Sequence, residues 1–295
     1  MKKSVSLLLA GLMLCGALAG CGGSNDSAES TTSTDTESTG TSGAIHVVSR
    51  EDGSGTRGAF VELTGVEDDN GDNTTVEAEI ANRTDAVLTT VAGNEAAIGY
   101  VSLGSLNDTV KAVTVDGVEA TVDNVKSGDY TLSRPFNIAT KGEPTGVAAD
   151  FIGFIMSADG QAIVGEDYIT VNDNAEAFTS DGSSGHITVG GSSSVSPVME
   201  QLIEAYKAVN PNAQIDLQTS DSTSGMTGAM DGTFAIGMAS RELKDEEAAE
   251  LTGTAIALDG IAVIVNTANT VDNLTMDQIR SIYVGETTDW ADVAA

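Results

Sequence analysis

The chain has 295 residues and a formal net charge of -31 at pH 7, with 44 acidic residues against 13 lysines and arginines. So negative a charge argues against nucleic acid and anionic membrane surfaces as partners, because both would repel it. It does not exclude an anionic ligand, since salt at 0.1 M screens charges more than about 10 Å apart, whereas hydrogen bonds inside a cleft are not screened.

The first twenty residues have the pattern of a signal peptide. Lys2 and Lys3 precede an apolar run over residues 5–14, which is shorter than the about 20 apolar residues of a membrane-spanning helix. The Leu-Ala-Gly before Cys21 resembles the lipobox of bacterial lipoproteins, in which cleavage leaves the cysteine as a lipid-modified amino terminus. We therefore expect residues 1–20 to be removed and Cys21 to carry a lipid anchor. The alternative is an ordinary signal followed by an incidental cysteine.

Residues 21–43 have the composition of a flexible tether. Beyond Cys21 they are almost entirely Ser, Thr, Gly, Asp and Glu, and none is large enough to form a core. Roughly 250 residues follow, which is enough for one large domain or for two lobes that each have a core.

Behind the tether, short β-branched runs alternate with amphipathic helical patterns, which predicts an α/β architecture. The strand-like runs are residues 45–48, 97–101, 187–189, 214–218, 235–238 and 261–265. Helical spacing of apolar residues occurs over residues 197–209, and over residues 275–284 with Thr275 as the expected cap. Residues 172–185 turn polar and rich in Gly and Ser, and we interpret them as an internal linker.

The first of three loops that suit an oxyanion comprises residues 49–57, SREDGSGTR, between the strand 45–48 and a helical pattern. A glycine-containing turn at a helix start exposes free amide groups and the positive end of the helix dipole. Ser54 and Thr56 add hydroxyl donors, and Arg50 offers a planar guanidinium with two parallel donors. The alternative is a capped turn with a surface arginine.

Two further loops repeat this design, each between a strand and a helix: GGSSSVSP at residues 190–197 and STSGM at residues 222–226. Burying a multiply charged anion is costly unless nearly every oxygen accepts a hydrogen bond. Donors that converge from several loops meet that requirement, so the three loops together predict one anion site.

The chain resembles the phosphate-specific binding proteins of ABC importers. The pieces that carry the resemblance cover nearly all of the chain beyond the tether: SREDGSGTR at Ser49, AIGYVSLGSL at Ala97, SRPFNIATKG at Ser133, GSSSVSPVMEQLIEAY at Gly191, IGMASRELKDEE at Ile236 and LDGIAVIVN at Leu258. Their order differs from that of the family, in which the last three pieces precede the first three. The chain is therefore expected to be circularly permuted, with residues 172–185 joining the usual chain ends and residues 289–293 leading into the strand 45–48.

The resemblance implies a two-lobed α/β fold, the type II periplasmic-binding-protein fold, with the ligand in the cleft between the lobes. One lobe would comprise residues 44–136 plus 258–295, and the other residues 137–257. The chain would cross between them near Pro135 and Ala257, and closure would be a hinge motion.

The resemblance also assigns the ligand contacts, residue by residue, to Arg50, Ser54, Gly55, Thr56, Ser193, Ser194 and Thr223. Ser240 and Arg241 stand where some members have an acidic residue that accepts the proton of phosphate and repels sulfate. We expect both to contact the ligand or to support residues that do, although Arg241 could instead begin a solvated acidic helix. Asp52 could supply the missing acceptor, or it could orient Arg50 or cap the turn.

The implied function is capture of inorganic phosphate outside the cell for separate permease subunits of an ABC transporter, without catalysis, cofactor or metal. If the signal is removed, Cys21 is the one cysteine left, which excludes an intrachain disulfide. One alternative is a phosphate sensor or adhesin of the same fold. Another is a secreted hydrolase that uses Ser54; its only possible histidine bases are His46 and His186, and neither has an orienting acid by spacing.

The permuted order leaves two assemblies open. The 14 residues of the linker could span roughly 45 Å if extended, so one chain could close on itself as a monomer. The alternative is exchange of halves between chains. We expect the monomer.

Overall fold

The computed structural model describes residues 41–293, so the predicted signal peptide, Cys21 and residues 21–40 of the predicted tether lie outside the described residues. The strands are β1 (His46–Arg50), β2 (Glu67–Asp68), β3 (Gly71–Asp72), β4 (Glu79–Ala81), β5 (Ala97–Ser102), β6 (Val110–Ala112), β7 (Thr114–Val115), β8 (Ser133–Thr140), β9 (Gly185–Ser192), β10 (Ala213–Ser220), β11 (Ile236–Ala239), β12 (Thr252–Asn266) and β13 (Asn273–Leu274). The helices are α1 (Gly55–Leu63), α2 (Thr84–Gly93), α3 (Val122–Ser127), α4 (Gly146–Ile155), α5 (Ala158–Asp167), α6 (Ser196–Val209), α7 (Ser222–Asp231), α8 (Asp245–Ala248) and α9 (Met276–Tyr283), with the 3-10 turns η1 (Leu103–Ser105) and η2 (Trp290–Asp292). The α/β class predicted from the sequence is confirmed.

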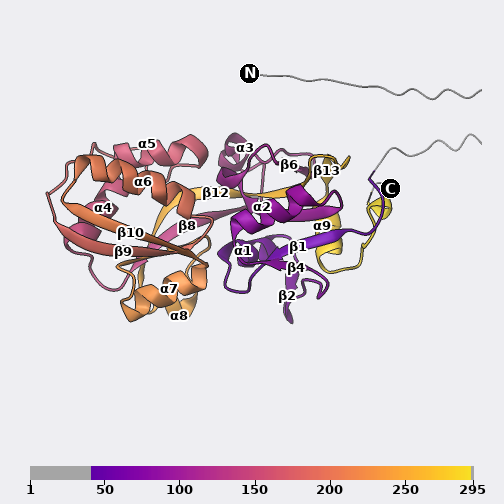
Figure 1. Ribbon diagram of the computed structural model, residues 1–295, viewed down its shortest axis with the longest axis horizontal. Helices are drawn as coiled ribbons and strands as arrows, with labels where there is room; N and C mark the ends of the chain where they lie inside the picture. Colours follow the sequence, from indigo (N-terminus) through magenta and orange to yellow (C-terminus); the bar gives the residue numbers. More distant parts are fainter. Residues whose placement is uncertain (1–40, 294–295) are drawn as a thin grey trace, which may run out of the picture. The chain divides into compact units, whose positions relative to one another are not determined.

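One sheet runs through the molecule in the order β10-β9-β11-β8-β12-β5-β1-β4, and β6 also pairs with β12. The long strand β12 joins its two portions: residues 252–260 pair with β8, and residues 261–265 pair with β5. Figure 1 shows β8 and β12 crossing between the two groups of helices. The sheet is therefore continuous through β12, which pairs with β8 in one portion and with β5 in the other.

Helix starts follow the capping rules that the sequence displays. Thr275 caps α9, as expected, and it forms a capping box with Gln278, in which each side chain bonds the backbone N–H of the other residue. Ser54 caps α1 by accepting from the Arg57 N–H. Because a capped helix start fixes the direction of the preceding turn, these residues help to set where each loop points.

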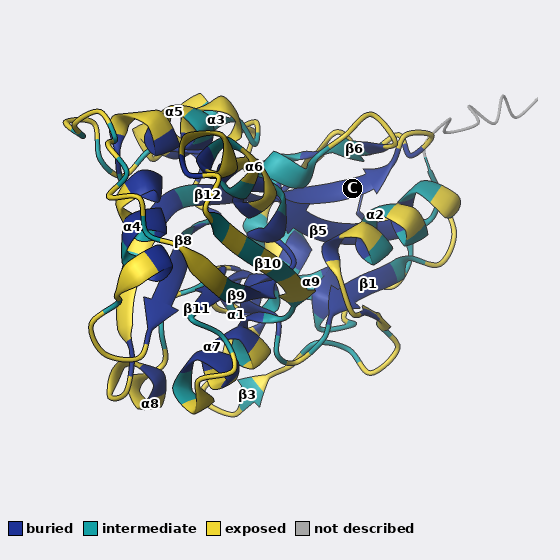
Figure 2. Cartoon of the chain, turned by 60° about the vertical axis from the view of Figure 1, so that its left-hand side comes forward, coloured by how far each residue is buried: buried dark blue, intermediate teal, exposed yellow. Residues whose placement is uncertain are grey.

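Two large hydrophobic clusters lie on either side of the crossing strands. The Trp290 cluster includes the stacked rings of Phe60 and Tyr100, whose centroids are 3.9 Å apart. The Phe151 cluster packs α4, α5 and α6 on the other portion of the sheet. In Figure 2 the central strands are buried, and β10 alternates between exposed and part-buried residues, as expected of an edge strand. The buried residues pass from one cluster to the other between Leu132, just before β8, and Phe136 on β8, and between Ala257 and Ile261 on β12.

The polar segment at residues 172–185 forms no helix, and only its last residue, Gly185, belongs to a strand, but it is fastened to the fold. Asp150 of α4, 7% exposed, accepts hydrogen bonds from the Ser180 hydroxyl (2.7 Å), the Asp181 amide (2.9 Å) and the Tyr206 hydroxyl (2.6 Å). Phe178 packs against Phe154 with ring centroids 5.3 Å apart. The predicted linker, residues 172–185, therefore packs against the Phe151 cluster.

The beginning and the end of the described chain lie side by side. Ala44 and Asp289 form an antiparallel bridge, and the Ile45 amide donates to the Thr288 carbonyl at 2.8 Å. Among residues 41–293, no single helix is long and apolar enough to cross a membrane; α4 and α5 meet that test only together, as a pair bent by 58°.

Candidate functional site

Seven hydroxyl side chains meet where α1 and α2 face the ends of β9 and β11. We call them the hydroxyl cluster: Thr56, Thr84, Ser192, Ser193, Ser194, Ser222 and Ser240. All seven are buried, and none is more than 7% exposed. Figure 1 shows α1 and α2 lying opposite the end of β9. The cluster thus draws on segments far apart in the sequence.

Short distances connect the members of the cluster. Thr56 Oγ1 lies 2.8 Å from Ser194 Oγ and 3.3 Å from Ser240 Oγ. Thr84 Oγ1 lies 3.2 Å from the hydroxyl oxygens of both Ser193 and Ser194. Each hydroxyl can donate or accept, so the group can rearrange its hydrogen bonds around an added oxygen atom.

Arg50 supplies a guanidinium at the edge of the cluster and is 2% exposed. Its Nε and Nη2 each donate to Glu51 at 2.8 Å, while Nη2 also donates to Ser193 Oγ at 3.1 Å and Nη1 to Thr84 Oγ1 at 3.3 Å. The Glu51 carboxylate therefore balances the buried charge, and the hydroxyls of Thr84 and Ser193 connect that charge to the cluster.

Two glycines permit the close approach of the loops. A Cβ on Gly55 would collide with Ser222 Oγ and lie 2.9 Å from Ser240 Oγ. Gly191 has φ +138°, and a Cβ there would meet the backbone of Met238. These two positions require glycine if the hydroxyls are to meet.

Four helices start at the cluster, which favours negative charge there. Thr56, Thr84 and Ser222 lie in the first turns of α1, α2 and α7, and Ser194 lies just before α6. The residues before α2 and α6, Arg83 and Val195, make no side-chain cap hydrogen bond. The first amide of α2, that of Thr84, donates instead to Ser193 Oγ of the cluster at 3.3 Å, and the helix dipoles add partial positive charge.

Most of the residues that the sequence singled out are brought together here: Arg50, Gly55, Thr56, Ser193, Ser194 and Ser240 lie in or against the cluster. Ser54 is buried and caps α1. Asp52 differs, because its side chain is 96% exposed and pairs with Arg57 at 2.7 Å. Arg57 reaches across the turn, since it also pairs with Asp72 at 2.8 Å, and so the Asp52 carboxylate faces outward. The structure does not bring Asp52 to the cluster.

Thr223 and Arg241 also lie outside the cluster. Thr223 Oγ1 accepts from Arg241 Nη2 at 3.4 Å, and the Arg241 guanidinium forms two bonds of 2.7 and 2.8 Å with Glu247. With Asp52, both line an outer hollow of about 510 Å³. Helix α7 begins one residue before Thr223, which turns Ser222 inward in its place.

Sequence reasoning missed four contributors: Thr84, Arg134, Ser192 and Ser222. Ser192 and Ser222 adjoin residues that it did select. Thr84 follows the short strand β4 without a glycine-rich turn, and only its place at a helix start could have indicated it. Arg134 lies inside a strand, and its Nη2 donates to Thr56 Oγ1 at 3.0 Å.

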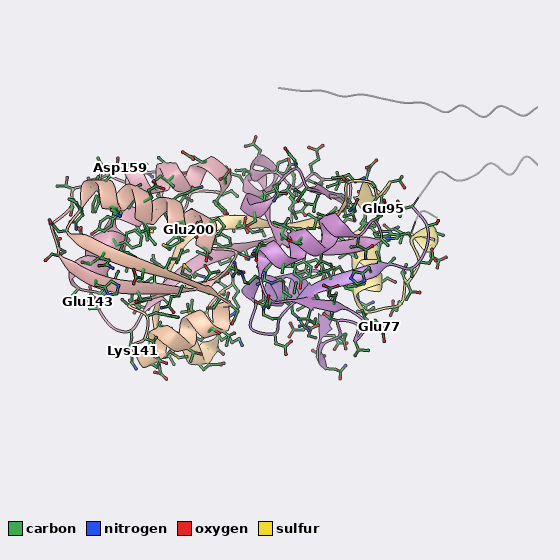
Figure 3. All side chains as sticks on the ribbon, viewed as in Figure 1. Glu77, Glu95, Lys141, Glu143, Asp159 and Glu200 are labelled. Atoms are coloured by element: carbon green, nitrogen blue, oxygen red, sulfur yellow. The ribbon has the colours of Figure 1, made fainter. Side chains whose placement is uncertain are left out.

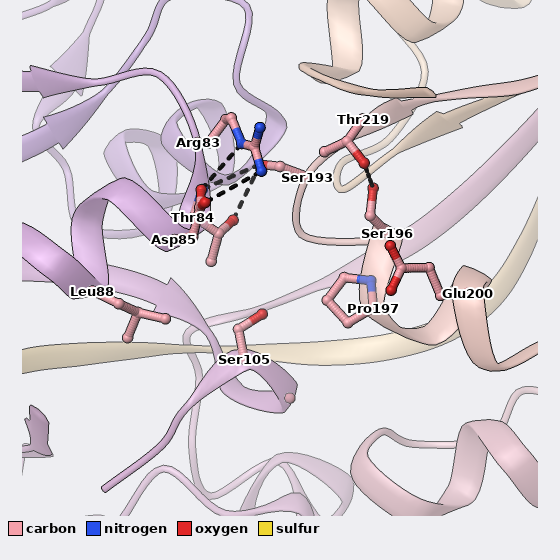
Figure 4. A pocket seen from close by; sticks show the side chains of 11 residues that line it. Arg83, Thr84, Asp85, Leu88, Ser105, Ser193, Ser196, Pro197, Glu200 and Thr219 are labelled. Carbon is pink, nitrogen blue, oxygen red and sulfur yellow. Dashed lines mark hydrogen bonds and ion pairs between the residues drawn. The ribbon is translucent and has the colours of Figure 1, made fainter. Parts of the chain in front are cut away.

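A cavity of about 310 Å³ adjoins the cluster, because Thr84 and Ser193 line both. Figure 4 shows its other walls, where Arg83 pairs with Asp85 at 3.1 Å and Ser196 lies 2.9 Å from Thr219. Apolar and polar side chains line the cavity together, among them Leu88, Pro197, Asp85 and Glu200.

Many of the acidic side chains that give the chain its charge lie on the outside. Glu77, Glu95, Glu143, Asp159 and Glu200 are all exposed, and Figure 3 shows the first four toward the outer parts of the molecule and Glu200 on α6, nearer its middle. Salt screens such charges, whereas the carboxylates of Glu51 and Asp259 are each paired with a buried arginine. The overall negative charge is therefore compatible with a site for an anion.

The two histidines do not support a serine nucleophile. Contrary to the expectation from spacing, each has an acidic partner: His46 Nε2 lies 2.8 Å from Glu79 and His186 Nε2 lies 2.8 Å from Asp216. Neither bonds a serine within residues 41–293, where no group of three metal-ligating side chains occurs either.

Comparisons with known proteins give a consistent result. The model of the PBP superfamily domain matches residues 25–159 and 176–295. The phosphate-binding protein PstS 2 of Streptococcus agalactiae serotype V is 48% identical over 300 residues, covering 99% of this chain and 98% of that protein. PstS 2 of Streptococcus pneumoniae serotype 4 is 45% identical over 294 residues, covering 98% of each.

A solved structure agrees with the sequence matches. The crystal structure of a phosphate-binding protein of a phosphate ABC transporter from Streptococcus pneumoniae TIGR4 is 46% identical and superposes with a TM-score of 0.69, covering 85% of this chain and all of that chain. Because each sequence alignment spans nearly the whole of both chains, this chain and these relatives share one order of segments.

Proposed function

Because the chain belongs to the PBP superfamily and, within it, to the phosphate-binding proteins named PstS, we propose that it captures inorganic phosphate for import by an ABC transporter. The observation that carries the proposal is the hydroxyl cluster, in which seven buried hydroxyls lie beside Arg50 at a place where four helices start. Such a set of donors matches a tetrahedral anion, each of whose oxygens needs hydrogen bonds when it is buried.

Binding would exchange hydroxyl–hydroxyl contacts for contacts to the anion. The Arg50 guanidinium and the hydroxyls of Thr56, Ser193 and Ser194 would donate to its oxygens. A hydroxyl can also accept, so Ser240 could take the hydrogen bond from the proton that phosphate carries near neutral pH. Selectivity over sulfate would then depend on hydroxyl orientation rather than on a repelling carboxylate. The cavity shown in Figure 4 is the proposed way in.

Capture would proceed by closure of two lobes, residues 44–136 plus 258–295 and residues 137–257. The changeover between the hydrophobic clusters on β8 and β12 supports hinge crossings near Pro135 and Ala257. The contact between Thr56 and Ser194 would link one lobe to the other. An open form would separate these hydroxyls and expose them to the anion.

The remaining expectations are part of the same proposal. The protein would be secreted, anchored through Cys21, active as a non-enzymatic monomer and served by separate permease subunits. Its segment order would be circularly permuted relative to other members of the binding-protein family. The bridge between Ala44 and Asp289 supports the permutation, since the two ends of the described chain already lie together.

Calorimetric titration of the ligand-stripped protein tests the function. We expect phosphate to bind with a Kd of about 1 µM or tighter, which corresponds to roughly -8 kcal/mol, and sulfate to bind much more weakly. No heat with phosphate, or equal affinity for both anions, would contradict the proposal.

A further inference from the structure

A second buried arginine stands behind the hydroxyl cluster. Arg134 of β8 lies directly opposite Asp259 of β12 in the strand register. Arg134 Nη1 lies 2.8 Å from Asp259 Oδ2, and the two side chains are 3% and 0% exposed. A fully buried ion pair contributes little net stability, because desolvation opposes the attraction. Stability alone therefore does not explain why this ion pair is buried behind the cluster.

Arg134 contacts the cluster and its surroundings through each of its nitrogens. Nη2 donates to Thr56 Oγ1 at 3.0 Å, Nε to the Ser240 carbonyl at 3.2 Å, and Nη1 to the Gly260 carbonyl at 3.1 Å. A guanidinium has five N–H groups. The three hydrogen bonds account for three of them. Of the two that remain, one belongs to Nη1, the nitrogen paired with Asp259, and one to Nη2, the nitrogen that bonds Thr56.

The surroundings of Asp259 determine how much of the Arg134 charge is neutralised. Burial raises the pKa of Asp259 to about 6, although the guanidinium of Arg134 acts to lower it. Tyr168 also faces the carboxylate, and its own pKa is raised by burial and by Asp259, so it stays neutral. Burial lowers the pKa of the Arg134 guanidinium and Arg50 lowers it further, whereas Asp259 raises it.

We propose that Arg134 is a second anion-binding arginine of the hydroxyl cluster, and that Asp259 holds its guanidinium in place and competes with the anion for its charge. The inference rests on the proposed phosphate function and adds a residue pair to it. Arg134 would donate the second N–H of Nη2 to the anion and would position Thr56 through the first. Ionised Asp259 would weaken binding, and protonated Asp259 would leave the Arg134 charge available.

Two substitutions test the pair, with phosphate as the probe on the full mature chain. Arg134→Lys keeps a charge but loses the planar set of donors, and we expect it to weaken phosphate binding by about 100-fold or more. The control is Arg57→Lys, at the neighbouring arginine whose guanidinium faces Asp52 and Asp72; it should change the affinity less than threefold, within about 0.6 kcal/mol.

Asp259→Asn supplies a readout that loosened packing would not produce. The affinity ratio of this variant to the unmodified protein is compared at pH 5.5 and pH 8.5, so that the titration of phosphate itself cancels. We expect the variant to bind phosphate as tightly as the unmodified protein at pH 5.5. At pH 8.5 it should bind about ten times more tightly, the equivalent of one pKa unit.

The outcomes separate the two proposals. Absence of phosphate binding by the unmodified protein would refute the phosphate function itself. Normal binding by that protein, with Arg134→Lys unchanged or with a flat pH ratio for Asp259→Asn, would overturn the role of the pair alone. If one variant does not fold, as judged by a thermal unfolding transition, the other decides.

Discussion

Arg50 and Arg57 are seven residues apart, and both are anchored by carboxylates, yet they face different surroundings. Arg50 is buried and reaches Ser193 and Thr84, whereas Arg57 turns outward to Asp52 and Asp72. The difference follows from position: Arg50 ends a strand and Arg57 lies in the first turn of α1. Only the first guanidinium can donate to an anion in the cluster.

Replacement of Arg50 by alanine should therefore weaken phosphate binding by about 100-fold or more, or roughly 3 kcal/mol, because a charged donor to a buried anion is lost. Arg57→Ala serves as the matched control, and we expect it to change the Kd by less than tenfold. Calorimetric titration of both variants measures this. Equal losses for the two substitutions would place the anion elsewhere.

At the scale of elements, the segment at residues 172–185 depends on Asp150 for its position. Burial raises the pKa of Asp150, but hydrogen bonds from Ser180, Tyr206 and Asp181 outweigh that effect and lower its pKa overall. A group with a lowered folded-state pKa contributes stability above its unfolded pKa, and this contribution is lost as the pH falls through the folded pKa.

Asp150→Ala should accordingly reduce the free energy of unfolding by about 2 to 4 kcal/mol at pH 7, since it removes several hydrogen bonds to a charged acceptor and leaves the Tyr206 hydroxyl without its acceptor. The difference should shrink below about pH 4. Urea unfolding of both proteins, at pH 7 and at a pH below 4, measures this difference in the free energy of unfolding. Asp159→Ala, at an exposed carboxylate that accepts from the Phe178 amide, should cost less than about 1 kcal/mol. A pH-independent difference would contradict the role given to Asp150.

Local sequence predicted those parts of the site that depend on one strand, one turn and one helix start. Ser193, Ser194 and Thr56 lie in such loops, and the alternation of strands and helices predicted the architecture. Arg134 and Thr84 could not be found in this way, because their contacts with Thr56 and Ser193 join residues 78 and 109 positions apart. The sequence predicted Thr223 as a member of the site, whereas in the structure the neighbouring Ser222 faces the cluster. Which of these two residues faces inward depends on the residue at which α7 begins.

At the scale of the whole molecule, the pairing of β12 with both β8 and β5 connects the two hydrophobic clusters through a pair of strands. Residues 172–185 are fastened within the same chain, and the first and last described segments meet at Ala44 and Asp289. Both features favour closure of one chain on itself.

We therefore expect a monomer, with or without phosphate, in a light-scattering measurement of molar mass. The physical reason is that every strand of the sheet finds its partners within this chain. A dimer that persists on dilution would instead indicate exchange of halves between chains.

The central claim is that the anion binds in the hydroxyl cluster, and the most direct measurement is a crystal structure with arsenate, whose arsenic atom anomalous diffraction can locate. Arsenate has the shape and protonation chemistry of phosphate. We predict one arsenic position with oxygens in hydrogen-bond distance of Thr56, Ser193 and the Arg50 guanidinium. An arsenic position in the outer hollow beside Asp52, Thr223 and Arg241 would contradict the account.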